Sequence, residues 1–388
     1  MIVVEIVFWL SAALIVYTHL GYPATLWLLL HLPGHRRRFQ GSPPYSGDNA
    51  GNDAEGGLPA VSLIVPAYDE EEVIAAKVAN ALALDYPRDR LQVIVASDGS
   101  SDATVGRARA AGADLVLDLP AGGKVAALNA AAEQATGELL AFSDANCTWA
   151  PGALRRLIEP FADSAVGYVC GQVRFVDEGG GNLEGAYWRY EMEVREMESA
   201  LAGVTAGNGA IYAVRRAAYL PLAASGSHDL SFPFLLAKRG LRSLYAPAAR
   251  AEEKMVPTLE GEFARKRRMM VGLWDIVLGE GMLSPRGYPP LYAFELVSHR
   301  LLRYLSPALH VVALLANLIL LDQGWVYAVT FAAQLALLVA ALLGRRLPQP
   351  PFRIARYYVL TTAAIAAGLW DRRRHGASGR WEKAEGTR

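Results

Sequence analysis

One short stretch, residues 139–146, reads Leu-Leu-Ala-Phe-Ser-Asp-Ala-Asn. Its apolar first half predicts a buried strand, and in open α/β sheets ligands bind beyond the carboxyl ends of the strands. Asp144 and Asn146, at positions i and i+2, can both point at one hard divalent cation. The alternative is a turn that opens a helix, because Asp and Asn cap helices and Pro151 is suited to a helix start.

The same ending recurs upstream. The β-branched run 61–65 is closed by Pro66 and followed by Asp69 and Glu70, and the run 91–96 is followed by Asp98. Helical segments separate these apolar runs. This alternation predicts an α/β fold with a mostly parallel, doubly wound sheet. Each acid alone is compatible with a helix cap, but together, at one edge of one sheet, they predict an acidic pocket.

The usual phosphate motifs are absent, since neither a G-x-G-x-x-G after the first strand nor a Walker P-loop is present. Instead Gly122-Gly123-Lys124 opens a helical segment. A lysine near a helix N-terminus is suited to a diphosphate. An ordinary glycine-rich helix start is the alternative.

Composition limits the function classes. The chain has 388 residues, is 53% apolar, and carries 38 basic against 38 acidic residues, so bulk charge gives no argument for a nucleic-acid partner. Two cysteines make no disulfide framework. Cys147 and Cys170 are expected to be small buried hydrophobes, and no histidine lies near Cys147 in sequence to activate it.

The apolar excess is concentrated at the two ends of the chain. Residues 6–30 contain no Asp, Glu, Lys or Arg, and a helix over this uncharged segment would be long enough to cross a bilayer. Arg36 to Arg38 follow directly and predict that the next domain is cytoplasmic. We therefore expect an N-terminal transmembrane helix in 1–33, a flexible linker in 34–60, a catalytic domain in 61–285 and a membrane-associated region in 286–388.

In that last region, His299, Arg300 and Arg303 favour an interfacial stretch, and 304–321 and 325–343 are each long enough to span. The run 357–370 is short and is followed by three arginines. We expect it to be shallow, re-entrant or packed against its neighbours. The pattern predicts two to three C-terminal membrane helices and a multi-pass protein of the inner (cytoplasmic) membrane.

Four motifs, in order over some eighty residues, closely resemble those of family 2 glycosyltransferases. They are Val65-Pro66-Ala67-Tyr68-Asp69-Glu70, Ser97-Asp98-Gly99-Ser100-Ser101-Asp102, Gly123-Lys124 with Ala127-Leu128-Asn129, and Ser143-Asp144-Ala145-Asn146. The resemblance implies a GT-A nucleotide-sugar-binding domain. It also implies donor contacts: Asp69, with Glu70, and Asp98 on the base and ribose, Lys124 near the nucleotide, and Asp144 on the diphosphate through a divalent metal, Mg²⁺ or Mn²⁺.

One position departs from the family pattern. The metal motif there is often Asp-x-Asp, and here Asn146 takes the second place. An amide oxygen can ligate the same ions, but it adds no charge.

Further resemblances extend the site. A glycine-rich turn at 207–210 makes Asn208 a candidate donor contact. The family places its catalytic base at an acidic pair before a helix, which implies that role for Asp229, with His228 in place of the first acid. From the residues alone, Asp229 is also a plausible N-cap of the helix that follows.

The segment 261–279 is basic and amphipathic. One interpretation is a helix on the membrane surface. The other comes from the family's processive members, which carry Gln-x-x-Arg-Trp near here. This chain keeps an arginine without the Gln or the Trp, so Arg268 is the candidate diphosphate contact. Upstream, Trp188 and Glu191 lie on one face of a predicted helix at 183–201, and core packing and sugar stacking both remain open for Trp188.

These observations predict an inverting glycosyltransferase that takes a nucleotide sugar and modifies a lipid-linked or polysaccharide acceptor at the bilayer. Two alternatives remain open. One is a processive polysaccharide synthase with coupled translocation. The other is a catalytically inactive membrane scaffold or synthase subunit, which His228 and Asn146 favour.

Overall fold

The structure is a computed structural model that describes residues 1–32, 57–176, 183–224, 226–254, 259–347 and 349–376. Most of the predicted linker 34–60, the arginines at 36–38 and the residues after 376 lie outside this described part of the chain.

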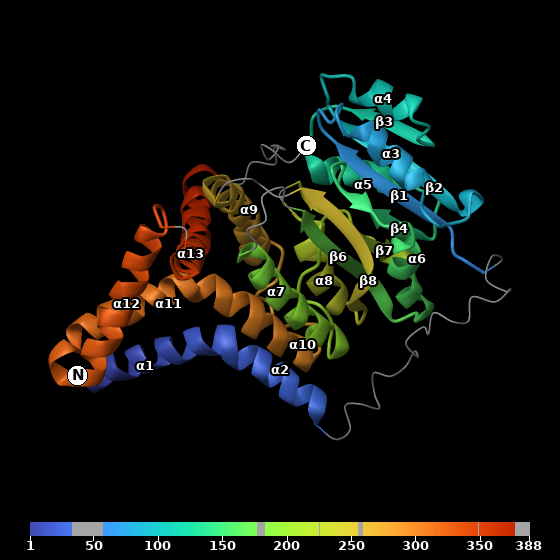
Figure 1. Cartoon of the computed structure of the whole chain (residues 1–388). Helices are drawn as coiled ribbons and strands as arrows, with labels where there is room; N and C mark the ends of the chain where they lie inside the picture. Colours follow the sequence, from blue (N-terminus) through green and yellow to red (C-terminus); the bar gives the residue numbers. More distant parts are fainter. Residues whose placement is uncertain (33–56, 177–182, 225, 255–258, 348, 377–388) are drawn as a thin grey trace.

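The described part of residues 61–254 is built around a single β-sheet (Figure 1). Within the described residues its strands lie in the order β3-β2-β1-β4-β7-β6-β8-β5. The strands are β1 Val61–Ala67, β2 Leu91–Asp98, β3 Leu115–Leu119, β4 Leu139–Phe142, β5 Thr148–Trp149, β6 Val166–Val176, β7 Tyr212–Arg215 and β8 Arg242–Lys254. The half formed by β3, β2, β1 and β4 is parallel, as predicted. The other half is mixed, because β7 pairs antiparallel with both β4 and β6.

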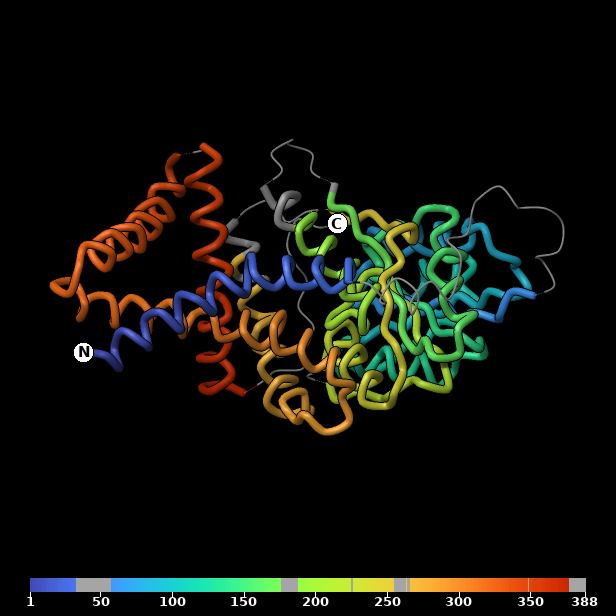
Figure 2. The backbone as a smooth tube through the Cα atoms, turned by 90° about the horizontal axis from the view of Figure 1, so that it is seen from below, coloured from blue at the N-terminus to red at the C-terminus, as the bar shows by residue number. Residues whose placement is uncertain are grey.

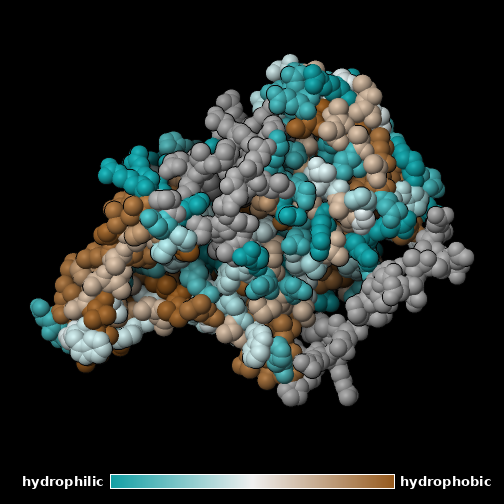
Figure 3. Space-filling view, in the orientation of Figure 1, coloured by the Kyte–Doolittle hydropathy of each residue, from teal (hydrophilic) through white to brown (hydrophobic). Residues whose placement is uncertain are grey.

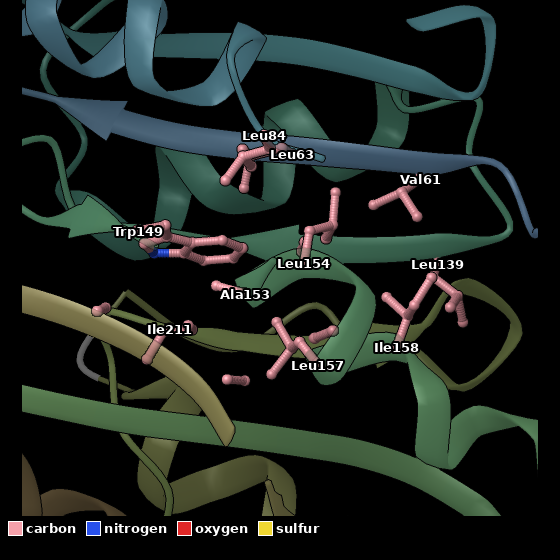
Figure 4. Packing of buried hydrophobic residues seen from close by; sticks show 14 of the residues in the cluster. Val61, Leu63, Leu84, Leu139, Trp149, Ala153, Leu154, Leu157, Ile158 and Ile211 are labelled. Carbon is pink, nitrogen blue, oxygen red and sulfur yellow. The ribbon is translucent and has the colours of Figure 1, made fainter. Parts of the chain in front are cut away.

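Helices cover both faces of the sheet, and strand alternation assigns the faces. In β1, Leu63 and Val65 pack towards the helices α3, α4 and α6, whereas Ile64 packs towards α5 and α8. Figure 4 shows the first of these layers, where Trp149 and Leu154 lie close to β1. The helices are α3 Ile74–Leu82, α4 Thr104–Ala110, α5 Lys124–Gln134, α6 Ala153–Ile158, α7 Leu183–Ala200 and α8 His228–Ala237. The doubly wound arrangement predicted from the sequence is therefore confirmed.

The carboxyl ends of three parallel strands meet at one edge. Ala67 at the end of β1 pairs with Ser97 at the end of β2, and Ile64 of β1 pairs with Phe142 at the end of β4. The loops that carry Asp69, Asp98 and Asp144 therefore leave the sheet side by side, which is the geometry that the sequence predicts.

Three helical segments in the described residues are long and apolar enough to cross a membrane: Ile2–His31, Pro290–Ile319 and Trp325–Leu343. The first joins α1 Ile2–Val16 and α2 Tyr22–His31 through a π-helical turn, and the second joins α10 Pro290–Glu295 and α11 Leu302–Ile319 in the same way. α1 lies beside α11, and α12 Trp325–Leu343 follows (Figure 2). Hydrophobic side chains cover these helices, whereas polar ones prevail over the sheet domain (Figure 3).

The last helix is longer than predicted. α13 spans Pro350–His375 and packs along α9 Leu259–Gly279. Arg267 of α9 pairs with Asp371 of α13, and Arg372 of α13 lies 2.9 Å from Asp275 of α9. A Cβ atom on Gly368 would lie 2.4 Å from the Cβ of Met270, so the two helices are in close contact. This arrangement agrees with the prediction that 357–370 packs against its neighbours.

We predict opposite effects for the same substitution at two glycines of the sheet domain. A Cβ on Gly137 would lie 2.4 Å from the backbone nitrogen of Ser62, so Gly137→Ala must displace backbone and should destabilise the fold by about 1–3 kcal/mol. At Gly106, within α4, nothing lies within 4 Å, and Gly106→Ala should stabilise by up to about 1 kcal/mol. Thermal unfolding in detergent measures both, and a stabilised Gly137→Ala protein would contradict the packing described.

Candidate active site

A cavity of about 1080 Å³ opens at the carboxyl edge of the sheet and extends towards α9, α11 and α13. Six of the predicted catalytic and donor-binding residues line it: Lys124, Asp144, Asn208, His228, Asp229 and Arg268. Asp69, Glu70, Asp98 and Asn146 are not among the lining residues, although they lie in the loops of the same edge.

The start of α5 is built by Asp98. Gly123 has a φ of 94°, which a residue with a side chain rarely adopts, and the Asp98 carboxylate accepts the N–H groups of Gly122 at 2.7 Å and Gly123 at 2.9 Å. This turn places Lys124 at the first position of the helix. Asp98 is 3% exposed, so in this structure its carboxylate holds the loop.

Lys124 contacts the loop that follows β4. Its Nζ donates a hydrogen bond to the Asp144 carboxylate. Burial lowers the pKa of Lys124, but Asp144, Asp229 and Glu253 outweigh burial and raise the pKa above its usual value. The ammonium therefore stays charged among these carboxylates, which is the state that a diphosphate contact requires.

Asp69 and Glu70 shape the neighbouring loop. Asp69 has a φ of 48°, and its Oδ1 accepts the backbone N–H of Ser101 at 2.7 Å. Glu70 is only 2% exposed, and its N–H donates to Thr104 Oγ1. The structure does not bring Glu70 to the cavity, and the donor contacts of both acids remain predictions.

The oxygen-bearing groups near Asp144 include one that the sequence did not indicate. Asn146 Nδ2 donates to Glu253 Oε1 at 3.2 Å, and Glu253 lines the cavity from β8. The short β5 brings this strand close, because Thr148 pairs with Glu252. Glu253 lies in an ordinary alternating strand some hundred residues away, so neither motif nor spacing marks it.

These groups fit a divalent cation only with help from a ligand. Among the described residues, no three His, Cys, Asp or Glu side chains are grouped to hold a metal ion. Asp144 and Glu253 offer carboxylates and Asn146 an amide oxygen. Mg²⁺ is usually bound by one or two carboxylates together with substrate phosphates, so this oxygen set is compatible with a metal shared with a diphosphate.

Asp229 begins α8 at the cavity wall. The N-cap of the helix is Ser227, so the structure corrects the alternative that Asp229 is the cap. Ser227 Oγ donates to the Asp229 carboxylate, and the Asp229 carbonyl accepts the N–H of Gly207 at 2.7 Å. The candidate base is thus tied to the turn that carries Asn208.

His228 is buried beside Asp229 in an aromatic pocket. Its Nδ1 lies 2.8 Å from the Tyr212 hydroxyl, and the rings of Phe142 and Phe232 pack against it edge to face. Burial, aided by Lys124, lowers the pKa of His228 to about 3. The imidazole is therefore neutral near pH 7, which favours a hydrogen-bonding role over proton transfer.

Asn208 is held by a residue that sequence reasoning missed. Arg195 of α7 donates from Nη1 to Asn208 Oδ1 at 2.8 Å, and Asn208 Nδ2 donates to the Gly171 carbonyl at 2.5 Å. Arg195 is 5% exposed. Arg195 lies four residues after Glu191, so helical spacing puts both on one face, and this spacing could have indicated Arg195 from the sequence.

Two remaining predictions concern Trp188 and Cys147. Trp188 donates from Nε1 to the Val173 carbonyl at 2.9 Å and packs edge to face on Phe175, while it also lines the cavity. Burial raises the pKa of the Cys147 thiol to about 12. An inert buried cysteine, as expected from the sequence, fits that value.

The neutral state of His228 makes stability depend on pH. Because its pKa is lowered from 6.5 to about 3 on folding, its contribution is complete above pH 6.5 and is lost as the pH falls towards 3. Between pH 7 and 5.5, the wild type should lose about 1 kcal/mol more stability than His228→Gln. Unfolding midpoints in detergent test this, with the exposed His31→Gln as control. Equal pH dependence in wild type and His228→Gln would contradict the buried neutral imidazole.

Two family models match the sequence. The one described as "Glycosyl transferase family 2" covers residues 62–220, and the one described as "Glycosyl transferase family group 2" covers residues 143–344. Both ranges include the loop of Asp144 and the turn of Asn208.

Curated relatives carry glycosyltransferase names. An N-acetylglucosaminyltransferase of Rhizobium meliloti (strain 1021) is 29% identical over 287 residues, 68% of this chain and 66% of that protein. A beta-monoglucosyldiacylglycerol synthase of Trichormus variabilis is 30% identical over 260 residues, 59% of this chain and 54% of that protein. The chain spans about half to two thirds of the length of the curated relatives it matches.

A solved structure shares the fold. Mannosyltransferase PcManGT from Pyrobaculum calidifontis, in complex with GDP-Man and Mn²⁺, superposes with a TM-score of 0.69, covering 94% of this chain and 98% of that one at 24% identity. At this identity the likeness concerns the GT-A architecture and not the substrate. Since one family model alone covers more than half of the chain, the chain belongs to the family 2 glycosyltransferases.

Proposed function

We propose that this glycosyltransferase moves a sugar, with inversion, from a nucleotide-sugar donor to a hydroxyl of a lipid-linked or polysaccharide acceptor at the cytoplasmic face of the inner membrane. The main support for the proposal is that Lys124, Asp144 and Asp229 line one cavity whose far wall includes apolar side chains of α9, α11 and α13. Charged groups for the donor diphosphate and apolar side chains next to a candidate membrane helix therefore line the same cavity.

Lys124, Asp144 and Arg268 are the groups for the donor diphosphate. Lys124 carries a full charge at the helix start, and Arg268 lines the same cavity from α9. Asp144, Asn146 and Glu253 would hold a divalent metal, which when bound neutralises the leaving diphosphate. Asp69, Asp98 and Asn208 complete the proposed donor set, with Asp98 acting through the loop of Gly122 and Gly123.

Asp229 is proposed as the general base. In an inverting transfer, the acceptor oxygen forms a bond to the anomeric carbon while the bond from that carbon to the diphosphate oxygen breaks. The hydroxyl proton passes to the Asp229 carboxylate, and the bonding electron pair leaves with the nucleoside diphosphate. Ser227 Oγ donates to this carboxylate, the Gly207 N–H holds the Asp229 backbone carbonyl, and neutral His228 adds no competing charge.

The membrane setting is supported by three apolar helices and by the names of relatives. Segments Ile2–His31, Pro290–Ile319 and Trp325–Leu343 are long enough to span, and the basic residues 36–38 favour a cytoplasmic domain. One relative is named for a glucosyldiacylglycerol product and another for N-acetylglucosamine transfer. The first of these names is consistent with a lipid acceptor.

The test of the base is Asp229→Asn. Loss of the proton acceptor should lower turnover by about 10²–10⁴-fold while donor binding is retained, because the amide keeps the size of the carboxylate. Purified protein is screened for nucleotide release from a panel of nucleotide sugars with membrane lipids as acceptors, and donor binding is measured separately. Asp118→Asn, an exposed acid on β3, is the matched control. Unchanged turnover in Asp229→Asn would exclude this residue as the base.

The same assay separates the alternatives drawn from the sequence. A processive synthase would release a distribution of long products, whereas a single transfer yields one added sugar by mass spectrometry. An inactive scaffold would release no nucleotide from any donor in either the wild type or the Asp229→Asn protein.

Metal use is tested by chelation and at Asn146. EDTA should abolish nucleotide release, and Mg²⁺ or Mn²⁺ should restore it. Asn146→Asp adds a carboxylate beside Asp144 and Glu253 and should lower the metal concentration for half-maximal rate by about tenfold. Asn146→Ala should raise that concentration. Full activity in EDTA would remove the metal from the proposal.

A further inference from the structure

The cavity continues well beyond the proposed donor site. Its far wall comes from α9, α11 and α13 and has an apolar part formed by Met270, Leu273, Ile276, Tyr304, Ala364 and Ile365. Charged side chains of α9 and α13, among them Lys266, Arg268 and Asp371, line the cavity as well. α11 belongs to the candidate span Pro290–Ile319, so this end of the cavity is continuous with a segment suited to the bilayer. A polar soluble acceptor would gain no hydrophobic stabilisation from this apolar part of the wall.

A buried cation lies on the wall of this cavity. Arg300 is 9% exposed and lines the cavity, and its Nε donates to Thr205 Oγ1 at 2.9 Å. Its Nη2 is buried and has no hydrogen-bond partner among the described residues. A buried guanidinium with an unmet donor is costly unless a ligand or a carboxylate meets it.

Two buried carboxylates of α7 lie nearby, and both have other partners. Glu191 pairs with Arg303 at 2.7 Å. Glu198 accepts hydrogen bonds from Tyr22 at 2.7 Å and from Thr205, and lies 2.6 Å from His299 Nδ1. Arg300 acts on the charge of Glu198, but its Nη2 has no hydrogen-bond partner among the described residues, and a guanidinium binds planar or tetrahedral oxyanions well.

We propose that the acceptor is a membrane lipid in which a phosphate joins the apolar tail to a hydroxyl-bearing head, with Arg300 on the phosphate and the tail along α9, α11 and α13. A buried cation at an apolar-walled cavity matches an anion attached to a tail. This inference rests on the proposed function, because the head hydroxyl is the group that Asp229 deprotonates. It excludes a neutral glycerolipid as the preferred acceptor.

The proposal is tested by binding without donor, so that it is read independently of turnover. Detergent-solubilised full-length protein is titrated with three probes: radiolabelled dioleoyl phosphatidylglycerol, dioleoylglycerol and glycerol 3-phosphate. The first carries tail, phosphate and head hydroxyl, the second lacks the phosphate, and the third lacks the tail. The wild type should bind phosphatidylglycerol at least about tenfold more tightly than either of the others.

Variants assign the effect to the two parts of the cavity. Arg300→Gln should weaken phosphatidylglycerol binding about tenfold and leave dioleoylglycerol binding unchanged, whereas Arg300→Lys should retain much of the affinity because it keeps the charge. Thr361→Trp, on the α13 wall, should weaken both lipids alike. The exposed Arg345→Gln is the matched control for lipid bound to the outer surface, and it should match the wild type.

Three outcomes would overturn the proposal. Equal affinity for dioleoylglycerol would make the acceptor neutral, and equal affinity for glycerol 3-phosphate would make the site a simple phosphate site. Equal losses in Arg300→Gln and Arg345→Gln would assign the binding to surface lipid. If Arg300→Gln unfolds in detergent, Arg300→Lys and Thr361→Trp decide by the same comparison. Asp229→Asn should bind phosphatidylglycerol as the wild type does, so failure of the proposed base does not affect this result.

Discussion

Two carboxylates on α7, Glu191 and Glu198, are buried and need opposite charge beside them. Burial alone would raise the pKa of Glu191, but Arg303 and His299 outweigh it and hold the pKa well below its usual range. The same histidine lies between both acids, 3.6 Å from Glu191 and 2.6 Å from Glu198. An unpaired buried charge would cost several kcal/mol, so α7 and the segment Pro290–Ile319 have to stay together.

This pairing joins the sheet domain to the membrane helices. Tyr22 of the N-terminal segment donates to Glu198, which His299 also contacts, so the segments Ile2–His31 and Pro290–Ile319 meet at the same residue of α7. Between these two acids on the same helix, Arg195 holds Asn208, which lies in the turn tied to Asp229. α7 therefore carries contacts to the membrane helices and to the candidate catalytic turn, and the cavity forms where these two sets of elements meet.

The sequence predicted the local features well and the distant pairings poorly. Residues 139–142 form a strand as expected, because continuous apolar side chains are buried on both faces of a parallel sheet. His299, Arg300 and Arg303 were expected at an interface, since burial of charge is unfavourable by default. Only the acids of α7, about a hundred residues earlier, make their burial possible. Glu253 and Arg195 were not predicted as site residues for the same reason, because the partner of a charged residue in a strand or helix is known only from the three-dimensional structure.

The charges around Lys124 bear on how the donor site works. Asp144, Asp229 and Glu253 all act on the Lys124 ammonium, so three carboxylates face one fixed cation. This imbalance repels a diphosphate, which itself carries negative charge. A divalent cation between Asp144 and the diphosphate would cancel this negative excess, and the positive charge of Arg268 on α9 would reduce it further. An amide at position 146 is compatible with the proposed function, because Glu253 already supplies a carboxylate next to Asn146 and the amide adds nothing to the carboxylate excess that faces the diphosphate.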